Sequence, residues 1–158
     1  MTTITTVTTA SKLADYYIWF ANDVGSYLSN HKLQKLLYYA QAWYLAFEDT
    51  PLFDEDFQAW VHGPTIPALF YEYKEQFGFK PILKEVEKPE FPEEVQEFLD
   101  ELSDEYFFCD AYELELMVRR EAPWIKARGD LPRDEPCRAI ITKESMREFY
   151  KTRVIEET

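Results

Sequence analysis

Residues 32–47, KLQKLLYYAQAWYLAF, constrain the fold most, because as a helix they are apolar on more than one face. One continuous stripe of this helix carries Leu33, Leu36, Leu37, Ala40, Trp43, Tyr44 and Phe47. Tyr38, Ala42 and Leu45 lie on the other side, beside Gln41 and Lys35. Such a helix is either buried between layers or offered to a partner. Burial is the ordinary outcome in a small helical domain, so we predict a mainly α fold around this helix.

Capping residues and apolar spacing predict five more helices and a small β element of at most two strands. The first helix starts at Ser11 and ends at Gly25, and the central helix starts at Ser29 or Asn30. Later helices are expected from Thr65–Pro67 to Gly78, around 95–106, after Asp110 and after Thr142. Strands are expected at 57–61 and 138–142, while 79–92 and 121–136 are expected to be irregular, Pro-rich connections.

Length and charge restrict the domain organisation and the class of partner. A chain of 158 residues favours one domain, here 11–155, after a flexible N-terminal tail at 1–10. Seventeen Lys and Arg against 30 Asp and Glu give a formal net charge of −13, which repels nucleic-acid backbones and attracts basic proteins. The acidic residues are densest at 85–105, where they fall on the solvent face of a predicted amphipathic helix.

The two cysteines and the apolar runs indicate a cytoplasmic protein. Cys109 and Cys137 form no CxxC pair and no disulfide framework. The N-terminal MTTITTVTTA lacks the basic and apolar parts of a signal peptide, and no stretch approaches the roughly 20 apolar residues of a membrane span.

The sequence contains little that indicates catalysis or a cofactor. It has no GxGxxG, GxSxG, HExxH or CxxC motif. A metal site from His31, His62, Cys109 and Cys137 lacks any pair at helical spacing, so a surface histidine and a turn histidine are the simpler interpretation. A nucleophile pair of Cys109 and His62 is an alternative, although a free cysteine in an apolar run is more often a small buried thiol.

Four ordered blocks, spread over residues 11–150, resemble the Panacea-domain family, also called SocA-like or GepA-type proteins, of bacteria and phages. The blocks are KLQKLLYYAQAW, the PLFDE turn, AWVHGPTIP and PWIKAR. The resemblance falls on Lys32, Leu33, Gln34, Lys35, Leu36, Tyr38, Ala40, Gln41, Trp43, Pro51, Leu52, Phe53, Ala59, Trp60, His62, Gly63, Pro64, Pro67, Glu121, Pro123 and Trp124.

The resemblance implies a mostly helical antitoxin that neutralises a small protein toxin encoded beside it. The better-known family member is a proteolytic adaptor that delivers its toxin to the ClpXP protease, and others neutralise by direct contact. The family pattern implies no catalytic residues. Family members often carry His four residues before the Pro of the PW block, where this sequence has Arg119.

We therefore interpret the chain as a non-enzymatic protein that binds a basic protein toxin, alone or as an adaptor for a ClpXP-type protease, without cofactor, metal, nucleic acid or membrane. Expected partner-binding residues are Tyr38, Tyr39, Gln41, Trp60, His62 and Arg119. Expected structural residues are Leu33, Leu36, Trp43, Gly63, Pro64, Pro67, Pro123 and Trp124. Two alternatives stay open: a phage or prophage protein that sequesters a host protein, and a hydrolase using His62 or Cys109.

Overall fold

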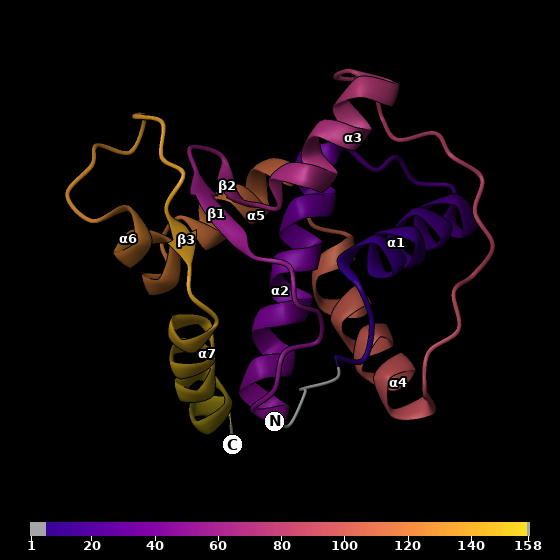
Figure 1. The fold of residues 1–158 in the computed structure, drawn as a ribbon. Coiled ribbons are helices and arrows are strands. Elements are labelled where there is room, and N and C mark those ends of the chain that lie inside the picture. The colour runs from indigo at the N-terminus through magenta and orange to yellow at the C-terminus, as the bar shows by residue number, and fades with distance from the viewer. Residues whose placement is uncertain (1–5, 158) are drawn as a thin grey trace, which may run out of the picture.

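The protein has the predicted mainly α fold, with one long helix at its centre. The computed structural model describes residues 6–157, so the first half of the predicted N-terminal tail lies outside the described residues. Helix α2 (Asn30–Glu48) runs through the middle, with α7 (Lys143–Glu157) on one side and α1 (Ala10–Val24) and α4 (Glu93–Leu102) on the other (Figure 1). Helices α3 (Pro67–Phe77) and α5 (Ala111–Val118) also contact α2. No helix of the described part is long and apolar enough to cross a membrane.

Helix α2 is buried along most of its length, and exposed only at Phe47 and Glu48 in its last turn, so most of the helix takes the buried outcome of the two that its sequence allows. Fifteen of its nineteen residues are buried, so neighbouring elements cover both apolar faces. Ser29 caps its first turn by accepting a hydrogen bond from the Lys32 backbone N–H. The elements that cover α2 are therefore positioned by their contacts with it.

Two buried glutamines of α2 fix the chain that follows the helix. The Gln41 side chain accepts a hydrogen bond from the Leu52 N–H and donates one to the Phe53 carbonyl, both at 2.7 Å. The Gln34 Oε1 atom accepts the Ile66 N–H at 2.8 Å. These amides satisfy backbone groups that lie outside any helix or sheet, so the loop 49–56 and the entrance to α3 take defined positions.

The sheet contains one strand more than the sequence predicts. Strand β1 (Phe57–Trp60) pairs antiparallel with β2 (Gly63–Thr65) and with β3 (Ile140–Ile141), in the order β2-β1-β3. The sequence predicts β1 and β3 but treats Gly63-Pro64 as a break. Because β2 is an edge strand, Pro64 can occupy it despite its missing N–H.

Three other local predictions are wrong in detail. Helix α1 is capped by Thr9 rather than Ser11. The last turns after α4 form a π-helix, η1 (Ser103–Phe107). The segment 121–136 begins with helix α6 (Ala122–Arg128), which carries Pro123 in its first turn.

Arg128 joins the end of α6 to the sheet. The residue is 4% exposed, and its guanidinium donates to the Ala59 carbonyl on β1 and the Pro132 carbonyl, both at 2.8 Å. It also reaches the carbonyls of Arg133 and Glu135 and lies 4.8 Å from the Trp124 ring. One side chain therefore ties α6, the loop after it and the sheet together.

We predict that Gln41→Ala lowers the free energy of unfolding by about 2–4 kcal/mol, because it leaves the Leu52 N–H and Phe53 carbonyl buried without partners. Urea unfolding followed by circular dichroism measures this loss. The matched control is Gln76→Ala at an exposed position of α3, which should stay within about 0.5 kcal/mol of the parent. Equal losses of unfolding free energy in the two variants would contradict the claim that the Gln41 hydrogen bonds fix the loop at 52–53.

Candidate functional site: the hairpin pocket

The tip of the β1–β2 hairpin places Val61 and His62 at the surface. Trp60 and Gly63 pair across the hairpin, which leaves a two-residue turn. Gly63 has φ +119°, and a Cβ there would lie 3.2 Å from both the Lys35 Cε and the Val118 Cγ1 atoms. The turn therefore needs glycine for its backbone conformation and for its close approach to α2 and α5.

The imidazole of His62 is held by helix α5. Its side chain is 64% exposed, and its Nδ1 atom lies 2.8 Å from the Glu115 Oε1 atom. Because a carboxylate only accepts hydrogen bonds, Nδ1–H is the donor. Arg119, one turn further along α5, lies 3.7 Å from the other carboxylate oxygen. The ring is thus exposed but fixed in orientation.

A buried lysine lies beneath this turn. Lys35 is 2% exposed, and its Nζ atom donates to the His31 carbonyl at 3.2 Å. Burial lowers the pKa of Lys35 to about 8, while the Glu115 charge opposes that shift. The His31 ring lies 5.3 Å from the His62 ring, and burial, followed by the charges of Lys35 and His62, lowers the pKa of His31.

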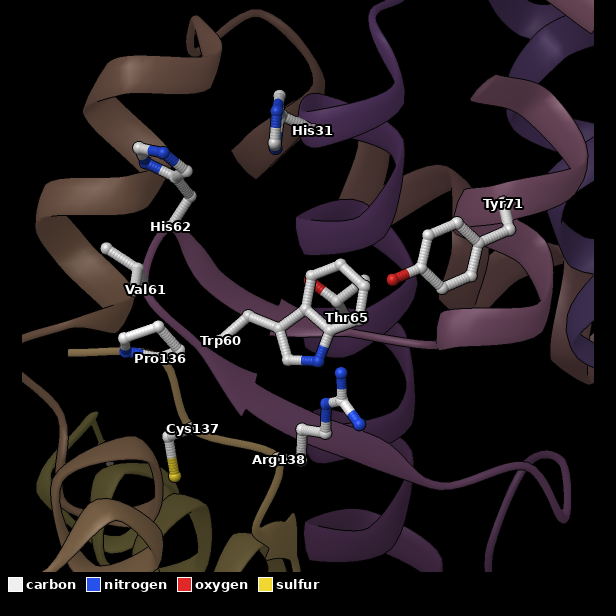
Figure 2. A pocket seen from close by; sticks show the side chains of 9 residues that line it. All are labelled: His31, Trp60, Val61, His62, Thr65, Tyr71, Pro136, Cys137 and Arg138. Atoms are coloured by element: carbon white, nitrogen blue, oxygen red, sulfur yellow. The ribbon is translucent and has the colours of Figure 1, made fainter. Parts of the chain in front are cut away.

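His31 and His62 line a cavity of about 220 Å³, which we call the hairpin pocket (Figure 2). Trp60 and Tyr71 form its aromatic part, with their ring centroids 5.8 Å apart. Arg138 extends from the chain that leads into β3. The full lining is His31, Trp60, Val61, His62, Thr65, Tyr71, Pro136, Cys137 and Arg138.

The hairpin pocket does not contain the nucleophile pair considered from the sequence. Cys109 does not line it; the Cys109 thiol lies 3.9 Å from the Glu105 carbonyl, and burial raises its pKa. Cys137 does line the pocket, but its sulfur points away from His62 in Figure 2 and accepts the Ala139 N–H at 3.5 Å. Among the described side chains of residues 6–154, no three from His, Cys, Asp or Glu are grouped to hold a metal ion.

The structure brings half of the expected partner-binding residues to this region. Trp60 and His62 line the pocket, and Arg119 joins it through Glu115. Tyr38, Tyr39 and Gln41 are instead 0%, 1% and 1% exposed. They face α7, the sheet and the loop at 52–53, so a partner cannot contact them in this conformation.

The expected structural residues are mostly in the core. Leu33, Leu36, Trp43, Gly63, Pro64, Pro123 and Trp124 are buried, and Pro67 is half-buried at the start of α3. The Trp124 Nε1–H donates to the Trp60 carbonyl at 2.8 Å, so the PW block is hydrogen-bonded to strand β1 of the hairpin.

Sequence reasoning missed Lys35 and Glu115 as parts of the site, and considered His31 only as a metal ligand. His31 and Lys35 stand one helical turn apart on α2, and Glu115 and Arg119 have the spacing of an i,i+4 ion pair. Each spacing places its two residues on the same face of a helix, which was the signal in the sequence that they could act together. What the sequence did not contain was the packing of the hairpin turn between the two helices.

The fold and the pocket define a small helical protein whose exposed features suit contact with another molecule. Over residues 33–125, more than half of the chain, the sequence matches the family described as "Antitoxin SocA-like, Panacea domain". The chain therefore belongs to the SocA-like Panacea family. This membership supports a role of the toxin–antitoxin type, a protein partner such as a toxin, and a regulatory rather than enzymatic activity. Searches of curated proteins and of solved structures gave no match.

The buried lysine has a pH signature. Because the Lys35 pKa is about 8 in the folded chain and 10.5 ordinarily, the unfolded chain binds more protons between these values. The contribution of Lys35 to the free energy of unfolding therefore increases with pH in that window. We predict that the free energy of unfolding of the parent rises by about 1–2 kcal/mol between about pH 7.5 and 9.5 because of Lys35, and that Lys35→Met abolishes this rise.

Urea unfolding of the parent and Lys35→Met at several pH values measures this term. Lys126→Met, at an exposed position of α6, is the matched control and should leave the pH dependence unchanged. Identical pH profiles for the parent and Lys35→Met would contradict the buried, destabilised charge.

Proposed function

We propose that this chain is an antitoxin that binds a cognate protein toxin without covalent chemistry, and that the hairpin pocket forms part of the contact. The observation that carries the proposal is a contrast inside the family-matched block. Ala59, Gly63 and Pro64 are buried, which accounts for their part in folding. His62 is instead 64% exposed and fixed by Glu115, a feature that the core does not require.

Fixed, exposed rings favour binding because little conformational entropy is lost when a partner orders them. Tyr71, at 54% exposure, lies beside Trp60 at the mouth of the pocket. Tyrosine and tryptophan are enriched among the residues that dominate binding energy. Trp60, His62 and Tyr71 are therefore the proposed contacts, with Arg119 positioning Glu115 behind them.

The charge of the chain favours a basic toxin. A net charge of −13 speeds the encounter with a positively charged protein and disfavours nucleic acid. The proposed partner is thus a basic protein toxin encoded next to this chain, which acts in the cytoplasm. Neutralisation takes one of two forms: occlusion of the toxin, or its delivery to a ClpXP-type protease. A host without that protease distinguishes them, because occlusion still rescues growth there and delivery does not.

We predict that co-expression of this chain relieves the growth arrest caused by the protein encoded beside it. Tyr71→Ala should weaken binding of the purified toxin about tenfold, since it removes an exposed aromatic contact. His62→Ala should also weaken toxin binding, because it removes the second proposed contact. Calorimetry measures both affinities, and the melting temperature of each variant checks its fold.

The matched control is Tyr27→Ala, a 75% exposed tyrosine in the turn between α1 and α2. Growth arrest that the parent chain fails to relieve would overturn the antitoxin function. A hydrolase gives a different pattern: His62→Ala would keep toxin affinity yet lose neutralisation, and the toxin would change in mass.

A further inference from the structure

A second surface lies at the other end of α2, where its last turns meet α4 and η1. Two adjoining hollows of about 230 and 460 Å³ share Phe47, Phe98 and Glu101 in their lining. We call them together the acidic aromatic groove. Its floor carries the aromatic side chains Trp43, Tyr44, Phe47 and Phe98, and its rim carries Glu48, Glu94, Glu97, Glu101 and Glu105.

The aromatic floor is fixed and partly open. Phe47 is 53% exposed, and its ring centroid lies 5.8 Å from that of Trp43 and 6.2 Å from that of Phe98. The Trp43 Nε1–H donates to the Tyr106 hydroxyl at 2.8 Å, which holds the indole in place. Exposed ring faces attract both apolar side chains and cations.

The rim is a stripe of negative charge without internal compensation. Glu94, Glu97, Glu101 and Glu105 follow one another at intervals of three and four residues, so they lie along one side of α4 and η1. Among the side chains that the structure describes (residues 6–154), no ion pair joins any of the five rim glutamates to a basic residue. The neighbouring Asp49, in contrast, is paired with Lys151.

The negative charge of the rim acts on a tyrosine in the floor of the groove. Burial raises the pKa of Tyr44, and the charges of Glu48 and Glu94 raise it further. Like charges along one stripe repel each other, so a cationic partner would relieve that repulsion at the same time as it covers Phe47.

We propose that the acidic aromatic groove is the docking site for a basic amphipathic helix of the toxin. The proposal rests on the proposed antitoxin function for the identity of the occupant. From Glu94 to Glu105 the stripe is about 16 Å long, which matches three turns of a partner helix. Lysine or arginine side chains of that helix pair with the rim, and its apolar side chains cover Phe47 and Phe98.

The groove is separate from the hairpin pocket. His31 stands in the first turn of α2 and Phe47 in the last, so about 24 Å of helix lies between the two surfaces. Variants in one surface therefore test that surface alone. The toxin, in this account, contacts the groove through its basic helix and the hairpin pocket through another part of its surface.

The experiment uses a synthetic, amidated 14-residue helical peptide with leucine on one face and lysine on the other. Calorimetry at low and moderate salt measures its affinity for the full chain. Phe47→Ala and the double variant Glu97→Gln/Glu101→Gln should each weaken binding about tenfold or more, and the double variant should also flatten the salt dependence. All three positions are exposed, and melting temperatures check that the variants fold.

The matched control is Glu72→Gln/Glu75→Gln on α3, which changes the net charge by the same amount at an exposed site away from the groove. It should weaken binding by less than about threefold, through long-range attraction alone. Equal losses in the groove and control variants, or a parent chain that does not bind the peptide, would overturn the groove proposal.

The purified toxin then identifies the occupant. Bound toxin should displace the peptide, and the groove variants should weaken toxin binding as they weaken peptide binding. A toxin that binds the parent tightly but leaves the peptide in place would overturn the groove proposal while the antitoxin function stands. A toxin that the parent neither binds nor neutralises would instead overturn the antitoxin function, whatever the peptide does.

Discussion

The burial of α2 along most of its length is the constraint on which the rest of the structure depends. A buried polar side chain is stable only where it finds a hydrogen-bond partner. Gln41 finds one in the loop at 52–53, Gln34 at Ile66, and Lys35 beneath the hairpin turn. The positions of that loop, the start of α3 and the hairpin tip therefore follow from the helix that they cover.

This scaffold gives the protein two chemically different surfaces. Near the first turn of α2, the hairpin pocket presents His62, Trp60 and Tyr71 beside Arg138. Near the last turn, glutamates surround exposed aromatic rings. Both surfaces belong to a packed core, and most of the residues on which the family resemblance falls are buried in that core.

Local chemistry made several boundaries predictable. Ser29 and Asp110 cap their helices as expected, and Gly25 and Gly78 end theirs. Strand β2 was missed because Gly63-Pro64 indicates a break in the sequence, although a two-residue turn pairs this segment with β1. Helix α6 was missed because the prolines of 121–136 indicate an irregular connection; in the structure its Arg128 reaches carbonyls on β1 and in a later loop. The spacing places Phe47 on the core stripe, yet its side chain is 53% exposed, beside Trp43 and Phe98. Whether the second face around Tyr38 is covered depends on α7, more than a hundred residues later, which no local pattern encodes.

The central claim is that the protein neutralises its target by occupying it. Titration of the purified chain against a fixed amount of the cognate toxin, followed by the residual toxin activity and by intact-mass spectrometry, tests this directly. Binding predicts that toxin activity falls in proportion to added protein and vanishes at a fixed molar ratio, with both masses unchanged. Loss of toxin activity at a small fraction of that ratio, with a change in the mass of the toxin, would show turnover and contradict the account.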